Sequence, residues 1–520
     1  MNRYTFAAVS LLALALPLNA RITRIVIDKR ESPAYQGQSF GEAGRYERLS
    51  GHAYGELDPK DPLNAIITDL QFAPRNTHGM VEYTATFLLV RPVDLSKTSG
   101  VLLYEVPNRG NAALDRPAPM TDYFKAGHVV LTSGWQGDIP AREGLETISV
   151  PVAKNPDGSS ITGRVLADFT DMAAHSTTLP IVIGRMPGAM PASLETAKAT
   201  LTRSVSEGSV AIPIRSTDWA FADCSKTAFP GTPDAGKICL KGGFDPAYLY
   251  ELVYTAKDPL VLGIGFAATR DLNAYFKSGE SQELPKKMPY GAAWGNSQSG
   301  NFLRTMIHLG FNQDEAGRIV WDGINPNIAA RQLAMNIRFA APGGAAGMFE
   351  PGSDGVLWWA DYTDEARRRP SGGLLDRCRA TETCPKVVET FGSSEFWDLR
   401  ASPGLVGTRA DRDIPLPPNV RRYYFPGVSH GGGPGGFSAA APKPPRACEL
   451  PANPNPSNDT LRALRAALID WVAKGIAPPP SQYPRLDRHE LVPPTQAAMG
   501  SPIVPGVPLP DNAILQFYDY

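Results

Sequence analysis

A turn rich in glycine and serine joins a strand-like run to a helix-like run near the middle of the chain. It has the sequence Gly-Asn-Ser-Gln-Ser-Gly, covers residues 295–300 and follows the apolar run at residues 290–294. Small residues two places before and two places after a serine let the neighbouring backbones approach closely on a tight strand-to-helix turn. Ser297 has Gly295 and Ser299 at these places. We therefore predict that Ser297 is a nucleophile presented by such an elbow.

Ser299 is the alternative nucleophile on the same turn. Its flanking places hold Ser297 and Asn301, which fit a tight turn less well. A glycine usually stands where this chain has Ser299, and Gly300 is expected to relieve part of the resulting crowding.

A nucleophilic serine needs a base, and in enzymes with such an elbow the acid and the histidine follow the serine in the chain. Three histidines do so. His308 would lie on the helix that begins at the turn, about three turns along it, and His489 lies in a tail rich in Pro and Arg. His430 follows the strand-like run at residues 422–425 and precedes three glycines. We predict that His430 is the base.

His430 has two other interpretations. The sequence His-Gly-Gly-Gly also occurs in oxyanion loops, but such a loop precedes the nucleophile, whereas His430 comes about 130 residues after Ser297. The second interpretation is an ordinary loop histidine beside flexible glycines.

The acid of the site is expected just beyond the strand-like run at residues 386–392. Glu395 lies there, and a carboxylate at this place would accept the second imidazole N–H and stabilise the imidazolium. Asp398 is a near alternative, and Asp322, after the strand-like run at residues 318–321, is a further one. An acidic residue after a strand also commonly caps the next helix, which is the structural interpretation of Glu395.

Two backbone N–H groups are expected to form an oxyanion hole. One belongs to Gln298, the residue after the nucleophile, and the other comes from the loop after the third strand. Residues 100–106 have the pattern of that strand, and the turn-rich segment at residues 107–111 follows it. Arg109 and Gly110 are the candidates for the second N–H, and a plain surface turn is the alternative.

Several stretches of the chain together resemble a bacterial and fungal family known as α/β hydrolase domain-containing protein. They are residues 41–49, 58–65, 73–76, 107–111, 295–300 and 478–484. The resemblance extends over nearly the whole chain after residue 20. It implies an α/β-hydrolase fold and a serine esterase-type site at the positions argued above, and it implies no substrate. The family usually has an aromatic residue before the elbow serine and an arginine after the closing glycine, where this chain has Asn296 and Asn301.

The order of the apolar runs indicates an α/β fold with a mostly parallel central sheet after a β-rich N-terminal part. Strands are predicted at residues 22–27, 81–90, 100–106 and 128–131, and helices at residues 262–276 and 460–474. Two segments, at about residues 139–245 and 340–384, interrupt the alternation of strands and helices. We interpret them as cap-like insertions in a single domain over residues 21–520.

The first twenty residues have the pattern of a secretory signal peptide. Arg3 supplies positive charge, residues 6–16 are apolar, and Ala20 is a small residue suited to cleavage. The apolar run is too short for a transmembrane helix, although a retained anchor is the alternative. We expect a mature protein that begins near Arg21 in the periplasm or the medium and has no membrane partner.

The charge balance and the missing motifs argue against nucleic-acid binding and against a nucleotide cofactor. The 51 Lys and Arg residues nearly balance the 52 Asp and Glu residues, so no electrostatic surface for nucleic acid is expected. No glycine-rich dinucleotide motif or phosphate loop is present, so no cofactor is predicted.

Five cysteines fit an oxidising compartment. Cys224 with Cys239, and Cys378 with Cys384, could each close a small loop, which leaves Cys448 unpaired. Neither pair has the two-residue spacing of a zinc knuckle or a nearby histidine, so no metal site is predicted.

Three residues near strand ends are candidate substrate contacts. Trp135 and Gln136 follow a predicted strand, and they are candidate substrate contacts together with Trp358. Tryptophans near strand ends suggest an aromatic or sugar ester, and core packing is the alternative for each of them. We predict an exported, cofactor-independent hydrolase of small-molecule carboxylic esters. Lactone or amide hydrolysis and acyl transfer would use the same triad, and a non-catalytic binding protein of the same fold is the other class.

Overall fold

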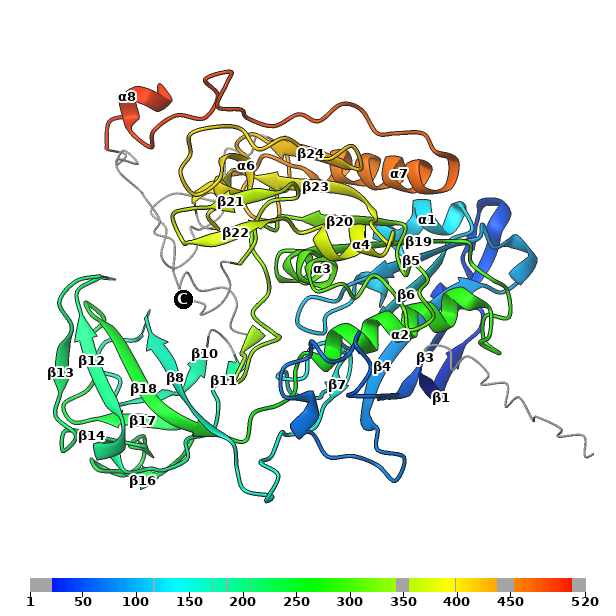
Figure 1. Ribbon diagram of the computed structural model, residues 1–520. Coiled ribbons are helices and arrows are strands. Elements are labelled where there is room, and N and C mark those ends of the chain that lie inside the picture. Colours follow the sequence, from blue (N-terminus) through cyan, green and yellow to red (C-terminus); the bar gives the residue numbers. More distant parts are fainter. Residues whose placement is uncertain are drawn as a thin grey trace, which may run out of the picture.

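The chain folds around one large mixed sheet (Figure 1). The computed structural model describes residues 21–115, 117–170, 172–183, 186–206, 208–342, 355–397, 399–436 and 453–506. Within these ranges the main sheet has eleven strands. Nine of them lie in the order β1 (Ile22–Glu31), β3 (Gly44–Leu57), β4 (Val81–Pro92), β6 (Val129–Ser133), β5 (Val101–Glu105), β19 (Tyr290–Asn296), β20 (Gly323–Asn327), β23 (Lys386–Gly392) and β24 (Val420–Phe425). The short strands β2 (Ser39–Phe40) and β7 (Ile148–Ser149) pair with β3 and β4.

Strand direction divides this sheet into two parts. β1, β3, β4 and β6 pair antiparallel in that order. β6, β5, β19, β20, β23 and β24 pair parallel. Because the carboxyl ends of parallel strands lie at one edge of a sheet, residues that follow β19, β20 and β23 are brought to the same edge.

Successive side chains of a strand point to opposite faces of the sheet, and both faces of the main sheet are apolar. In β5, Leu102 joins the hydrophobic cluster on one face and Leu103 joins the cluster on the other. The first face is covered by α2 (Ile264–Ser278) and α3 (Gln298–His308), and the second by α1 (Thr121–Lys125) and α7 (Asn458–Lys474) (Figure 1). Among the described helices, none combines the length and the apolar character that crossing a bilayer requires.

Most predicted elements are present, and two strands differ from the prediction. β3 was not predicted because its buried face includes glycines. One of these is Gly55, where a Cβ would lie 2.2 Å from the ring of Tyr83. The strand predicted at residues 318–321 is wrong, because the strand β20 begins at Gly323. Asp322 therefore precedes this strand and does not follow it.

The described residues between 162 and 257 form small sheets that are separate from the main sheet, and we call this part the β-lobe (Figure 1, lower left). One sheet contains β8 (Thr162–Phe169), β12 (Thr200–Ser204), β13 (Ile212–Ile214) and β18 (Leu249–Lys257). A second contains β9 (Thr178–Pro180), β14 (Trp219–Ala220) and β17 (Lys237–Leu240). Two-stranded pairs are formed by β10 (Val182–Ile183) with β11 (Met186–Pro187) and by β15 (Ala222–Asp223) with β16 (Thr232–Pro233). The β-lobe has its own hydrophobic cluster and holds the predicted disulfide between Cys224 and Cys239.

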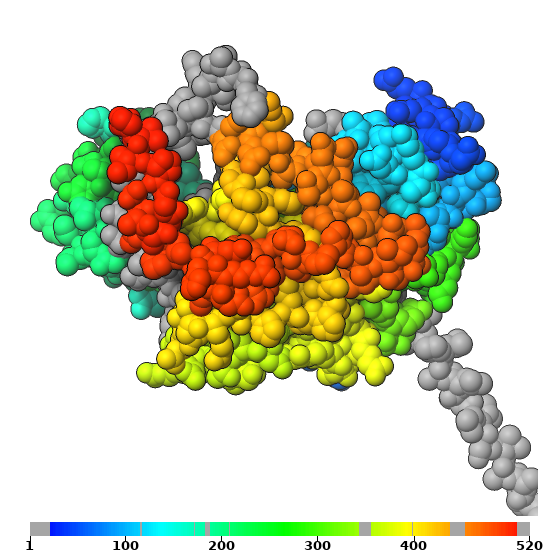
Figure 2. Space-filling model, turned by 90° about the horizontal axis from the view of Figure 1, so that it is seen from above, coloured from blue at the N-terminus to red at the C-terminus, as the bar shows by residue number. Residues whose placement is uncertain are grey.

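The C-terminal half adds short elements around the parallel strands. They are β21 (Tyr362–Asp364), β22 (Arg369–Gly372), α4 (Asp376–Ala380), α5 (Ser393–Trp397), α6 (Pro403–Val406) and α8 (Gln496–Met499). The second predicted disulfide joins Cys378 to Cys384 just before β23, whereas Cys448 lies outside the described residues. Figure 2 shows the C-terminal segment, orange to red, lying across the part of the chain that contains β23 and β24. Gln482 in this segment forms a parallel bridge with Tyr423 at the free edge of β24.

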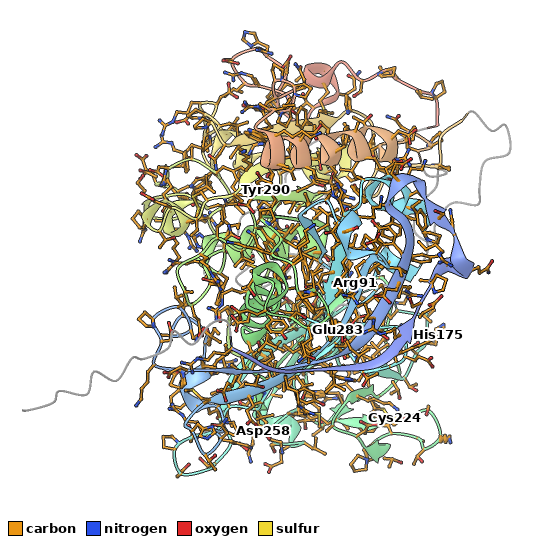
Figure 3. All side chains as sticks on the ribbon, turned by 90° about the vertical axis from the view of Figure 1, so that its right-hand side faces the viewer. Arg91, His175, Cys224, Asp258, Glu283 and Tyr290 are labelled. Atoms are coloured by element: carbon orange, nitrogen blue, oxygen red, sulfur yellow. A yellow bond between two sulfur atoms is a disulfide. The ribbon has the colours of Figure 1, made fainter. Side chains whose placement is uncertain are left out.

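An ion-pair group fixes the antiparallel strands against the segment that enters β19. Arg91 on β4 pairs with Glu47 on β3 at 2.7 Å and with Glu283 at 3.7 Å. Figure 3 shows Arg91 and Glu283 side by side. Arg30 on β1 also pairs with Glu283, at 2.5 Å. These contacts join three antiparallel strands to the segment between α2 and β19.

Candidate active site

Ser297 lies on a strained turn between β19 and α3. Its φ of 58° and ψ of −119° fall outside the regions that an L-residue ordinarily adopts, and such strain persists only where the surrounding structure holds it. A Cβ on Gly295 would lie 2.3 Å from the carbonyl oxygen of Ser299, and one on Gly300 would lie 2.7 Å from Cβ of Ala329. The turn therefore needs a glycine at both places.

His430 connects Ser297 to Glu395. Its Nε2 lies 2.8 Å from Ser297 Oγ, and its Nδ1 lies 2.6 Å from Glu395 Oε1. The histidine follows β24, and its backbone N–H donates to Ser394 Oγ at 2.9 Å, which ties its loop to α5. The structure thus brings together the three residues that the sequence predicted for nucleophile, base and acid.

The carboxylate of Glu395 is held on both oxygens. Glu395 lies in α5, directly after β23, and is fully buried. Its Oε2 accepts the backbone N–H of Gly392 at 2.5 Å, while Oε1 faces His430. A carboxylate fixed in this way can orient the imidazole ring and stabilise a positive charge on it.

The alternative residues lie elsewhere. Ser299 is fully buried within α3. Asp322 lies at the amino end of β20 and accepts a hydrogen bond from Lys277 Nζ at 2.8 Å. Since β19 and β20 run parallel, Asp322 is at the opposite edge of the sheet from Ser297. Asp398 lies outside the described residues.

The candidate oxyanion donors lie on the two segments that meet at the elbow. Gln298 is the first residue of α3, where backbone N–H groups have no partner within the helix. In the turn after β5, Asn108 Nδ2 donates to the carbonyl oxygen of Asn296 at 3.5 Å, which places this turn against the elbow. Arg109 and Gly110 follow with φ values of 51° and 78°.

The side-chain amides of Gln298 and Gln136 lie next to each other, beside the candidate oxyanion donor of Gln298. Gln298 Nε2 donates to Gln136 Oε1 at 3.4 Å and to the carbonyl oxygen of Pro342. Gln136 is fully buried, and its Nε2 donates to Asp138 Oδ1 at 2.8 Å. The structure thus brings Gln136, a predicted substrate contact, next to the residue that follows the nucleophile.

The two tryptophans predicted as substrate contacts are buried. Trp135 packs on Phe302, with 4.6 Å between ring centroids, and its Nε1 donates to the carbonyl oxygen of Pro107 at 2.8 Å. Trp358 packs on Tyr362 in a separate hydrophobic cluster, also at 4.6 Å. These environments favour core packing, the alternative interpretation of both residues. Trp135 also anchors the start of the turn that carries the second candidate donor.

A buried ion group, not predicted from the sequence, connects the elements of the three residues. Glu389 on β23 pairs with Arg304 on α3, and its Oε2 accepts from Arg422 Nε on β24 at 2.6 Å. Burial raises the pKa of Glu389, but the charges of Arg422 and Arg304 outweigh this effect, so the pKa lies below its usual value. The ionised carboxylate therefore holds together the helix after the nucleophile and the strands before the acid and the base.

A second polar group lies directly behind the elbow and was also missed. It consists of Asn296, Asn325, Asn327, Thr390 and Arg465. Its members come from three strands and α7. The only sequence signal is the unusual presence of asparagines in a strand.

The described residues contain no group of three or more His, Cys, Asp or Glu side chains arranged to hold a metal ion.

The chain is similar to a known protein family. A family model described as alpha/beta hydrolase domain matches residues 214–510, more than half of the chain, and this region includes Ser297, Glu395 and His430. No curated protein and no solved structure matches the chain.

Proposed function

We propose a serine esterase activity from the premise that this chain belongs to the alpha/beta hydrolase domain family. The observation that carries the proposal is the row of contacts from Ser297 Oγ through His430 to the buried Glu395. A strained serine with a base at hydrogen-bond distance, and an acid behind that base, is the arrangement that nucleophilic acyl transfer requires.

In the proposed reaction, Ser297 Oγ attacks the acyl carbon while His430 Nε2 takes the hydroxyl proton. The tetrahedral intermediate collapses, the alcohol leaves with the proton from His430, and the acyl group stays on Ser297 as an ester. Water then attacks this ester while His430 takes a proton from it, and collapse of the second tetrahedral intermediate returns this proton to Ser297 Oγ and releases the carboxylic acid. Glu395 holds the ring and stabilises the imidazolium in both halves of the reaction.

The proposed oxyanion hole uses the N–H of Gln298 and one N–H of Arg109 or Gly110. Two observations support it: the position of Gln298 at the start of α3, and the contact between the turn after β5 and the residue before Ser297. Fixed N–H groups aimed at the developing negative charge lower the barrier without reorganisation.

We also propose that the inserted segments at about residues 139–245 and 340–384 act as a cap. Phe339 packs against the hydrophobic cluster of the β-lobe, and three residues later the carbonyl oxygen of Pro342 accepts from the side chain of Gln298. The intervening backbone thus connects the β-lobe to the elbow. The proposed substrate is a small-molecule ester with an aromatic or sugar ring, and lactone or amide hydrolysis and acyl transfer remain open to the same residues.

Export is part of the proposal. Residues 1–20 lie outside the described residues, and the two disulfides favour an oxidising compartment. Mass spectrometry of protein recovered from the periplasm or medium should find a chain that begins near Arg21. An intact N-terminus on the recovered protein would contradict export.

The function is tested by labelling the purified protein with an alkyl fluorophosphonate and locating the adduct by peptide mass spectrometry. We expect one label, on Ser297, and at least about a thousandfold loss of ester turnover in Ser297→Ala. Ser299→Ala is the matched control on the same turn and should keep its activity. An unlabelled, inactive wild type would indicate a non-catalytic binding protein, and loss of activity only in Ser299→Ala would reverse the assignment.

A further inference from the structure

Five polar side chains behind the elbow form a closed ring of hydrogen bonds. Arg465 on α7 donates from Nη2 to Asn296 Oδ1 at 3.0 Å and from Nε to Asn325 Oδ1 at 2.7 Å. Asn325 Nδ2 donates to Thr390 Oγ1 at 3.1 Å, and Thr390 Oγ1 donates to Asn327 Oδ1 at 2.8 Å. Asn327 Nδ2 donates to Asn296 Oδ1 at 2.9 Å and closes the ring.

The directions of these hydrogen bonds distinguish two residues of the ring, Arg465 and Asn296. Arg465 only donates, because a guanidinium has no acceptor. The Oδ1 atom of Asn296 is the end point of the ring, where it accepts from both Arg465 and Asn327. Hydrogen bonds from a charged donor are stronger than those between neutral groups. The orientation of the Asn296 side chain is therefore set mainly by Arg465.

This ring is joined to the nucleophile by the backbone. Asn296 is the residue before Ser297, so fixing its side chain restrains the peptide unit that leads into the strained φ of 58°. The backbone N–H of Ser297 donates to the carbonyl oxygen of Asn327, another ring member, at 2.9 Å. The ring thus restrains, from its side chain and from its N–H, the peptide unit that precedes the N–Cα bond of Ser297.

Burying the charged guanidinium of Arg465 costs free energy, so its presence here needs a reason other than filling space. Burial lowers the pKa of Arg465, and attraction to Tyr123 and Glu105 opposes this effect only in part. The guanidinium lies over the ring of Trp294 at 5.4 Å and has amide oxygens as its hydrogen-bond acceptors. An apolar side chain would fill the same space without desolvating a charge.

We propose that Arg465 is a positioning residue that holds the elbow in the conformation in which Ser297 Oγ meets His430. It acts through Asn296 and does not touch the substrate. The inference rests on the proposed esterase function, and it adds a member to the site from a helix that carries none of the three reacting groups.

The test compares Arg465→Met, which removes the donors, with Arg465→Lys, which keeps a charge but not the two-pronged geometry. Arg462→Met is the matched control. Arg462 lies one turn earlier on α7, is about half exposed and pairs with Asp459 at 2.9 Å. Three readouts are needed: hydrolysis of 4-nitrophenyl acetate, the rate of fluorophosphonate labelling, and amide hydrogen exchange of the peptide that contains residues 295–301.

We expect Arg465→Met to lower kcat and the labelling rate by about 10- to 100-fold, because a displacement near 1 Å has effects of that order. KM should change little, hydrogen exchange in the elbow peptide should rise, and Arg465→Lys should lie between this variant and the wild type. Arg462→Met should match the wild type. In Arg465→Ala, guanidinium ion at non-denaturing concentration should restore part of the labelling rate, which a general loss of folding would not allow.

The proposal is overturned if Arg465→Met keeps wild-type turnover and exchange, or if its loss only follows the folded fraction measured by circular dichroism. It is also overturned if Arg462→Met shows an equal loss. A wild type without a label on Ser297 refutes the esterase function instead, and the exchange comparison then still decides whether Arg465 holds the elbow.

Discussion

Gly295→Ala tests whether close backbone packing is what holds the nucleophile. The added Cβ would lie 2.3 Å from the carbonyl oxygen and 2.4 Å from the carbonyl carbon of Ser299, whereas ordinary contact begins at 3.4 Å. Relief of this overlap requires the first turn of α3 to move by about 1 Å, since backbone atoms cannot rotate away as a flexible side chain can. That turn carries Ser297 and the N–H of Gln298 together.

We expect Gly295→Ala to remain folded, with a loss of stability of about 1 to 3 kcal/mol from overpacking. The rate of fluorophosphonate labelling at Ser297 should fall by about 100-fold, the effect of a displacement of this size. Gly236→Ala is the control, because the nearest atom to its new Cβ would be a side-chain oxygen at 3.5 Å. A folded Gly295→Ala protein that is labelled within threefold of the wild-type rate, a limit well inside that about 100-fold effect, would refute the argument.

Three further predictions concern the acid, the pH dependence of folding and the second disulfide. Glu395→Gln should lose about a thousandfold or more in turnover while Asp322→Asn keeps its activity, and the reverse result would place the acid at Asp322. Burial lowers the pKa of His128 to about 4 from 6.5. The neutral imidazole therefore contributes up to about 3 kcal/mol to the free energy of unfolding. This contribution is fully present above pH 6.5 and is lost as the pH falls toward 4. Urea denaturation at several pH values should therefore show a smaller loss of stability on acidification in His128→Gln, and equal slopes would exclude this role. Non-reducing peptide mapping after alkylation should find Cys378 joined to Cys384, and replacing both by Ala should lower the free energy of unfolding by roughly 2 kcal/mol, whereas alkylation of both thiols would contradict the bridge.

The sequence predicted the elements whose pattern is local. β23 has the bounds that its apolar run indicated, and Glu395 follows it as expected. The order of serine, acid and histidine left three histidines, and the strand-like run before His430 distinguished it from His308 on the helix and His489 in the tail. Each of these inferences needed only neighbouring residues and the direction of parallel strands.

The parts that were missed depend on contacts between distant residues. The sequence of β20 contains a proline and two asparagines, which are uncommon in strands. Asn325 and Asn327 stand there because they bond to Arg465 and Thr390, up to 140 residues away. The local pattern therefore pointed to the more apolar residues 318–321. For Trp135 the sequence left two interpretations open, since a position after a strand does not reveal whether a ring faces a pocket or the core, and the fully buried ring favours the core.

The bridge between Gln482 and β24 also bears on association of the protein with itself. β24 is the last strand of the main sheet, and an uncovered last strand offers unpaired N–H and C=O groups to any other chain. Residues 478–484 occupy this border: the N–H of Tyr424 donates to Gln482 O at 2.8 Å, and the N–H of Gln482 donates to Arg422 O at 2.9 Å. Proteolytic trimming before residue 478 would thus expose the N–H and C=O groups of β24 that Gln482 now pairs and leave an edge open to intermolecular β-pairing.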